Sequence, residues 1–408
     1  MNLAVKHTRT ALFYFFLTSL MGILLRAYPI ADFSFNYRFL VHAHSHIALL
    51  GWIYVGLTAV IYHLFLGDIK QSGVYRNIFR TTQVALIGML VTFPFWGYHP
   101  YSIFFSTLFI LASYAFTWFF IRHAPERYRK GYSFKCVKAG LYYMVVSSLG
   151  PWALGLIMNT LGSTSVWYKI AIYFYLHFQY NGWFLMALCG FLFFILEFGD
   201  IPVAPRQSRL FYRMLNAGII LTFFLSVLWT EPHYIFYFLG LSGAVIQLWA
   251  YILLFRIARS SRITSTGKTG GLKSTFSLLK VSGMLLLVKL LLQCFSAVPE
   301  IATMAYHTPE FIIGYLHWTF LGVISLALFA FFSHFRLLVF SRFAIGIYLA
   351  GFFITEFLIF YKGIALWLQW SLTEHYYLLL FCGSLLFSIA IGILLFRSFR
   401  KIRSKNTD

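Results

Sequence analysis

The stretch His42-Ala43-His44-Ser45-His46-Ile47-Ala48-Leu49-Leu50-Gly51-Trp52 places three histidines at the start of a long apolar run. Its outline returns twice, as His177-Phe178-Gln179-Tyr180-Asn181-Gly182-Trp183 and as His317-Trp318-Thr319-Phe320-Leu321-Gly322. In each copy a histidine is followed by four residues and then a glycine, and the copies are separated by close to a third of the 408 residues. From 13 histidines and 29 glycines, about one such pair is expected by chance. The pattern therefore predicts a threefold internal repeat.

The amino-acid composition places the chain in a lipid bilayer. Hydrophobic residues make up 60% of the chain and charged residues 11%, whereas about a quarter of the residues of a soluble globular domain are charged. Twelve apolar stretches approach the ~20-residue length that spans a bilayer. They cover about residues 9–28, 40–66, 77–97, 101–122, 136–160, 167–197, 210–230, 233–255, 273–296, 308–333, 340–362 and 373–397.

We therefore predict an all-α polytopic membrane protein with twelve transmembrane helices in three four-helix repeats. The chain is expected to form a single membrane domain over residues 1–408, with repeat units at about 1–130, 131–268 and 269–408. No segment is long or polar enough to form a separate soluble domain.

The net charge of +21 is distributed unevenly between the loops. With the N-terminus in the cytoplasm, all but five of the 32 Lys and Arg residues fall on the inner side of the membrane. This asymmetry predicts a protein of the cell inner membrane with both termini in the cytoplasm. Basic runs such as Arg127-Tyr128-Arg129-Lys130 are expected to lie near anionic lipid, and no nucleic-acid partner is expected. The five exceptions are Arg26, Arg38, Lys169 and Lys362 outside, and Lys289 within a helix.

Two features exclude other classes of protein or site. The apolar run after Lys6 and Arg9 is followed by no small-residue cleavage site, so we expect it to remain as the first helix. The four cysteines form no Cys-x-x-Cys and no Cys-x-x-Cys-His pattern, which argues against a thiolate metal site and a covalently attached haem.

His46, His177 and His317 are the main candidate ligands. Each is expected about six to ten residues into the second helix of its repeat, or ~9 to 15 Å below the outer face. Histidine within a membrane helix usually faces the protein interior. Three at one depth would share one buried site if the repeats close around an axis, although a histidine bonded to a nearby carbonyl is the simpler alternative. His42 shares a helix face with His46, whereas His44 points elsewhere.

Two charged residues are expected to be buried by their position in apolar helices. They are Lys289, in Leu287-Val288-Lys289-Leu290, and Glu356, in Ile354-Thr355-Glu356-Phe357. Charges within a membrane pair with one another or mark a functional route. The sequence leaves open a structural ion pair, a proton route and a contact with a cofactor.

The arrangement of twelve helices with histidines on helices two, six and ten resembles subunit I of the haem-copper oxidase superfamily, which includes oxygen and nitric oxide reductases. The resemblance implies that His46 and His317 bind a low-spin haem b. It matches His177 to a ligand of copper or another second metal. The family's helix-seven histidine pair has no counterpart in residues 210–230, and Tyr315 stands where the high-spin haem ligand is expected. The resemblance thus implies a degenerate oxygen- or NO-reducing site.

The segment from His44 to Gly51 is also similar to the His-x-His-x4-Gly segment of the NnrS family, membrane proteins linked to haem, copper and nitric oxide stress. This second resemblance adds His44 to the candidate metal ligands. It implies an alternative function in nitric oxide or metal handling.

We therefore expect a haem-binding redox protein that transfers electrons within the bilayer and that, if it is an enzyme, is an oxidoreductase of the haem-copper oxidase type. A quinol or cytochrome is the expected electron donor, with partner subunits. Arg38 is the candidate cofactor-binding cation: with Arg26 and Lys362 it lies on the expected outer side, where it would pair with a haem propionate. A solvated position at the membrane interface is the simpler alternative for each of the three. A cofactor-free transporter or scaffold is the remaining alternative, although transporters more often have two repeats than three.

Overall fold

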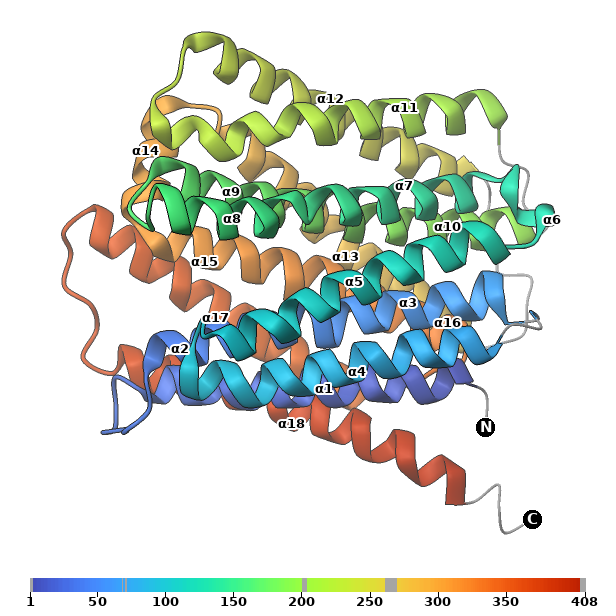
Figure 1. Cartoon of the computed structure of the whole chain (residues 1–408), viewed down its shortest axis with the longest axis horizontal. Helices are drawn as coiled ribbons and strands as arrows, with labels where there is room; N and C mark the ends of the chain where they lie inside the picture. The colour runs from blue at the N-terminus through green and yellow to red at the C-terminus, as the bar shows by residue number, and fades with distance from the viewer. Residues whose placement is uncertain (1–2, 68, 70–71, 200–203, 261–269, 404–408) are drawn as a thin grey trace. The chain divides into compact units, whose positions relative to one another are not determined.

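The computed structural model describes residues 3–67, 69, 72–199, 204–260 and 270–403 (Figure 1). These residues are mostly helical and include no β-strand. Within them, 12 helical segments are long and apolar enough to cross a membrane, which confirms the predicted all-α polytopic membrane protein. The segments are Leu3–Ala27, Tyr37–Leu66, Ser72–Trp96, Pro100–His123, Tyr132–Thr160, Val166–Phe198, Pro205–Thr230, Tyr234–Arg259, Phe276–Phe295, Pro309–His334, Arg342–Trp367 and Tyr376–Arg400.

The helices group into two compact units. Unit 1 comprises Met1–His123 and Leu328–Asp408, and unit 2 comprises Ala124–Ala327. The first boundary lies close to the expected end of the first repeat, and the second lies within the helical segment Pro309–His334. The division of the sequence into three repeats, within one membrane domain, stays a prediction.

The same local feature follows all three repeat histidines. A π-helix begins directly after His46 as η1 (Ile47–Tyr54), after His177 as η3 (Phe178–Phe184) and after His317 as η5 (Trp318–Ser325). Each π-helix contains the glycine of the repeated motif. Because π-helical turns are rare and often occur at functional sites, three in equivalent places mark the histidines as special positions.

Unit 1 is built around its second membrane span. This span consists of α2 (Tyr37–His46), η1, α3 (Val55–Ile61) and η2 (Tyr62–Leu66). In its apolar 18-residue stretch, 94% of the residues are buried. It packs against α1 (Leu3–Ala27), which also contacts α18 (Tyr376–Arg403). The start of α1 and the end of α18 lie at the same end of this unit (Figure 1). The remaining helices are α4 (Ser72–Trp96), α5 (Pro100–His123), most of α16 (Leu326–His334) and α17 (Arg342–Trp367).

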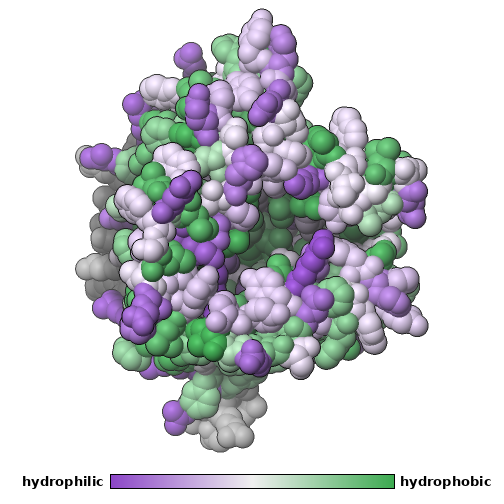
Figure 2. Space-filling model, turned by 90° about the vertical axis from the view of Figure 1, so that its left-hand side faces the viewer, coloured by the Kyte–Doolittle hydropathy of each residue, from purple (hydrophilic) through white to green (hydrophobic). Residues whose placement is uncertain are grey.

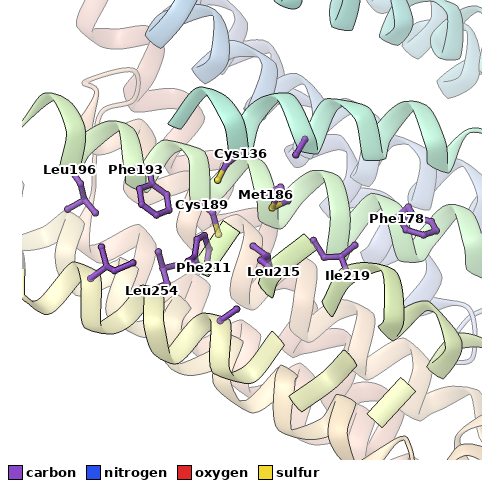
Figure 3. Packing of buried hydrophobic residues seen from close by; sticks show 13 residues of the cluster. Cys136, Phe178, Met186, Cys189, Phe193, Leu196, Phe211, Leu215, Ile219 and Leu254 are labelled. Atoms are coloured by element: carbon purple, nitrogen blue, oxygen red, sulfur yellow. The ribbon is translucent and has the colours of Figure 1, made fainter. Parts of the chain in front are cut away.

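Unit 2 has its apolar core between four helices. Side chains from α7 (Tyr132–Ser147), α10 (Leu185–Phe198), α11 (Pro205–Thr222) and α12 (Tyr234–Ser260) pack together there (Figure 3). The other elements of this unit are α6 (Glu126–Arg129), α8 (Leu149–Thr160), α9 (Val166–His177), η3, the 3-10 helix η4 (Phe223–Thr230), α13 (Gly270–Phe295), α14 (Pro299–His307), α15 (Pro309–His317) and η5.

A carboxylate connects two helix ends in unit 2. Glu197, at the end of α10, accepts hydrogen bonds from the backbone N–H groups of Tyr132 (2.5 Å) and Ser133 (3.3 Å) and from the Ser133 hydroxyl (2.5 Å). These groups form the N-terminus of α7, where unpaired N–H donors and the helix dipole favour a negative charge. The contact ties together the start of the first membrane span of unit 2 and the end of its second.

Figure 2 shows one face of the molecule in a space-filling view. Hydrophilic side chains are spread over this face among apolar ones. Such a mixture is expected where membrane helices end at the boundary between lipid and water.

Candidate functional site

In unit 1, two histidines of α2 present the same ring nitrogen to the backbone. His46 Nδ1 lies 2.8 Å from the carbonyl oxygen of His42, and His44 Nδ1 lies 3.0 Å from that of Thr18. Because a carbonyl oxygen can only accept, both Nδ1 atoms carry the proton and both Nε2 atoms keep a lone pair. Metal-binding histidines usually donate their second ring nitrogen in this way. Neither Nε2 atom has a hydrogen-bond partner among the described residues.

The three histidines of α2 face two directions, as expected from their spacing. The His46 ring stacks on Phe93 with 4.4 Å between centroids, and the His42 ring meets Tyr98 edge-on at 4.6 Å. His44 instead faces α1, where a Cβ at Gly22 would lie 3.2 Å from its Cε1 atom. All three imidazoles keep part of their surface exposed. His46 therefore combines an aromatic support, a defined tautomer and an Nε2 lone pair that has no hydrogen bond among the described residues.

In unit 2, both ring nitrogens of His177 are hydrogen-bonded. Its Nε2–H donates to the Ile219 carbonyl at 2.8 Å, and its Nδ1 accepts from the Asn181 amide at 3.2 Å. The side chain is 1% exposed. With both nitrogens hydrogen-bonded, His177 offers no lone pair to a second metal in this arrangement. The expected metal at His177 requires one of these two bonds to be given up.

The other predicted cofactor residues lie in both units. His317 ends α15 in unit 2 and is partly exposed, whereas His46 belongs to unit 1, so their pairing on one haem stays a prediction. Arg38 is exposed in the first turn of α2. Arg26 lies in the last turn of α1. The ammonium of Lys362 lies 5.5 Å from the centroid of the Tyr377 ring.

The described residues contain no group of three or more His, Cys, Asp or Glu side chains that is arranged to hold a metal ion. A haem iron with two axial histidines needs only two protein ligands. The Nε2 lone pair of His46, which has no hydrogen bond among the described residues, fits such a role. The hydrogen-bonded ring of His177 does not fit a second metal.

Both charges that the sequence predicted to be buried are buried. Lys289 is 0% exposed and Glu356 is 1% exposed. Lys289 belongs to unit 2 and Glu356 to unit 1, so an ion pair between them stays a prediction. Among the described residues, neither carboxylate oxygen of Glu356 has a hydrogen-bond partner.

Lys289 is the centre of a polar network that the sequence did not reveal. Its ammonium donates to Asn181 Oδ1 and, at 2.6 Å, to Gln293 Oε1. The Asn181 amide N–H donates to His177 Nδ1, and His177 Nε2–H donates to the Ile219 carbonyl. This first arm therefore runs from α13 through η3 and α9 to α11.

The second arm returns to the same part of α11. Gln293 Nε2 donates to Gln247 Oε1 at 2.8 Å, and Gln247 Nε2 donates to the Thr222 hydroxyl at 3.3 Å. Thr222 in turn donates to the Gly218 carbonyl at 2.7 Å. The Thr222 hydroxyl also lies 3.3 Å from the Ile219 carbonyl, on which the first arm ends, so the two arms close a ring of hydrogen bonds. The only sequence signal for it is the four-residue spacing of His177 and Asn181, and of Lys289 and Gln293, which puts each pair on one helix face.

No protein-family model matches the chain, and no curated protein matches its sequence. The resemblances to the haem-copper oxidase superfamily and to the NnrS family therefore rest on the quoted residues.

Proposed function

We propose that the chain is a haem-binding membrane protein that transfers electrons through a low-spin b-type haem, with His46 and His317 as axial ligands. One observation carries the proposal: the hydrogen bond from His46 Nδ1 to the His42 carbonyl, which leaves the Nε2 lone pair without a hydrogen bond among the described residues. The π-helix that follows both His46 and His317 supports equivalent roles for them. The choice of His317 as second ligand comes from the sequence resemblance.

The residues of the chain set the properties of such a site. Two neutral imidazoles give a six-coordinate iron that is suited to electron transfer. The backbone bond at Nδ1 fixes the orientation of the His46 ring and raises its basicity, and the stacked Phe93 ring excludes water from one side. Arg38 lies two helical turns before His46, or ~12 Å along the axis, and is the proposed partner of a propionate.

The proposal places the protein in the cell inner membrane with both termini in the cytoplasm, as the distribution of basic residues indicates. A quinol or a cytochrome is the proposed electron donor, with partner subunits. Reduction of dioxygen or nitric oxide is not part of the proposal, because residues 210–230 contain no histidine and the ring of His177 is hydrogen-bonded at both nitrogens.

An absorption spectrum of the purified protein tests the proposal. A Soret band with sharp reduced α and β bands is expected, and His46→Ala and His317→Ala should each abolish the α band because five-coordinate iron or no haem remains. His42→Ala is the matched control, since only its backbone carbonyl contacts His46 Nδ1. His177→Ala should also keep the band. Loss of the band in His177→Ala but not in His46→Ala refutes the assignment.

An NnrS-like role in metal or nitric oxide handling is a second candidate, favoured by the hydrogen bond of His44 Nδ1, which matches that of His46. This candidate predicts copper without haem, and loss of that copper in His44→Ala. A purified protein that contains neither haem nor metal instead favours the cofactor-free transporter or scaffold.

A further inference from the structure

All the hydrogen bonds in the ring around Lys289 run in the same sense: each group accepts on the side that faces Lys289 and donates on the side that faces away from it. An ammonium group only donates, so the amide oxygens of Asn181 and Gln293 must face it. Their amide nitrogens then point away and donate to His177 and to Gln247. Lys289 thereby determines the orientation of both amides and the tautomer of His177.

Each following bond keeps the same direction. The Gln247 amide donates to the Thr222 hydroxyl, which donates to the Gly218 carbonyl, and His177 donates to the Ile219 carbonyl. Every dipole in both arms has its negative end toward Lys289 Nζ. Buried dipoles that are aligned in this way strengthen one another in a medium of low dielectric constant. The ring is therefore a preorganised solvation shell for one positive charge.

Two aromatic faces complete the surroundings of this charge. The ring centroids of Tyr180 and Tyr315 each lie 5.7 Å from Lys289 Nζ, within the range of a cation–π interaction. No Asp or Glu of the described residues forms an ion pair with Lys289. Lys289, Asn181 and Gln293 are each no more than 4% exposed. Neutral oxygens and π faces thus replace both water and a counter-ion.

We propose that unit 2 contains a cation-binding cradle made by Asn181, Gln293, Tyr180 and Tyr315, in which the Lys289 ammonium is the resident ion. This tethered charge takes the place of a metal ion beside His177. His177 is a positioning residue in the cradle, because its Nδ1 orients the Asn181 amide so that Oδ1 faces the cation. The cradle fits a small primary ammonium ion, and it does not depend on haem in the rest of the molecule.

Chemical rescue of Lys289→Ala tests the cradle. The alanine supplies Cβ, and n-propylammonium supplies the three missing carbons and the ammonium group. We expect Lys289→Ala to lower the melting temperature of the purified protein by several degrees. We expect n-propylammonium chloride to restore it with saturable concentration dependence. 1-Propanol and sodium chloride at the same concentrations should have no such effect, because neither brings an ammonium group to the cradle.

Lys289→Met is the matched control, since it fills the same space without a charge and should not respond to n-propylammonium. If Lys289→Ala does not fold, its folded yield should rise several-fold when n-propylamine is present during expression, and 1-propanol should not raise it. Equal responses of Lys289→Ala and Lys289→Met, or no response of Lys289→Ala by either measurement, would overturn the proposal.

Metal content gives an independent measurement. Wild-type protein and His177→Ala are each exposed to copper or zinc and then desalted. The two proteins should retain the same amount of metal. His177→Ala should instead lower the melting temperature, because Asn181 loses the acceptor that orients it. One metal ion per chain that depends on His177 would overturn the proposal, whether or not the protein contains haem.

Discussion

The glycines of two π-helices, Gly51 of η1 and Gly182 of η3, allow close contact with the preceding membrane helix, and replacing them with alanine tests that contact. An added Cβ at Gly182 would lie 2.7 Å from Tyr143 Cβ, and one at Gly51 would lie 2.8 Å from Tyr14 Cγ. Both tyrosines belong to the helix that precedes the π-helix span, α7 in one case and α1 in the other. Because the contacted atoms lie next to the tyrosine backbone, a change of rotamer gives little relief and the helices must move apart.

Two opposing effects set the magnitude. Replacing glycine by alanine in a helix stabilises it by about 0.5 to 1 kcal/mol. Overpacking a close contact costs roughly 1 to 3 kcal/mol. We therefore expect Gly51→Ala and Gly182→Ala to lower the free energy of unfolding by about 1 kcal/mol, the centre of the difference between these two effects. At Gly346 in unit 1 and Gly155 in unit 2, an added Cβ meets no atom within 4 Å, so alanine there should be neutral or stabilising.

Thermal unfolding of the four single variants in one detergent, followed by circular dichroism, measures the difference. The comparison within each unit removes general effects of the substitution. If Gly51→Ala and Gly182→Ala raise the melting temperature as much as Gly346→Ala and Gly155→Ala do, the close packing of the π-helices against α1 and α7 is wrong.

Three further predictions concern the ends of the helices. Glu197→Ala should lower the free energy of unfolding by about 2 kcal/mol, because the N-terminus of α7 loses its cap and the charge that complements its dipole. Glu197→Gln should lower it by about half as much, and equal losses for the two variants in a denaturation experiment would argue against the role of the charge. Tyr75→Phe should cost about 1 kcal/mol, because it removes the buried hydroxyl that lies 2.8 Å from His7 Nδ1, and an unchanged melting temperature would contradict that bond. Reporter fusions after Lys130 and after Arg397 should both report the cytoplasm, and an outward C-terminus would contradict twelve spans with an inside N-terminus.

The sequence alone determined the membrane class, the number of spans and the positions of the buried charges. Span 40–66 is observed as Tyr37–Leu66 and span 167–197 as Val166–Phe198. These features are predictable because the transfer of apolar side chains into lipid is a local, nearly additive property of each segment. A spanning segment must also satisfy its own backbone, which makes each one a helix. The burial of Lys289 and Glu356 follows from the same reasoning, since each lies in the middle of an apolar helix.

Only the tertiary structure decided which atoms these side chains use. His46 and His177 have the same place in the repeat, yet Nε2 is free in the first and bonded to the Ile219 carbonyl in the second. The partners of Lys289 show the same dependence, because Asn181 comes from a helix more than a hundred positions earlier in the chain. Hydrogen bonds require distances near 3 Å and defined angles. Such contacts depend on how separate helices pack, and the pattern of residues along one helix does not contain that information.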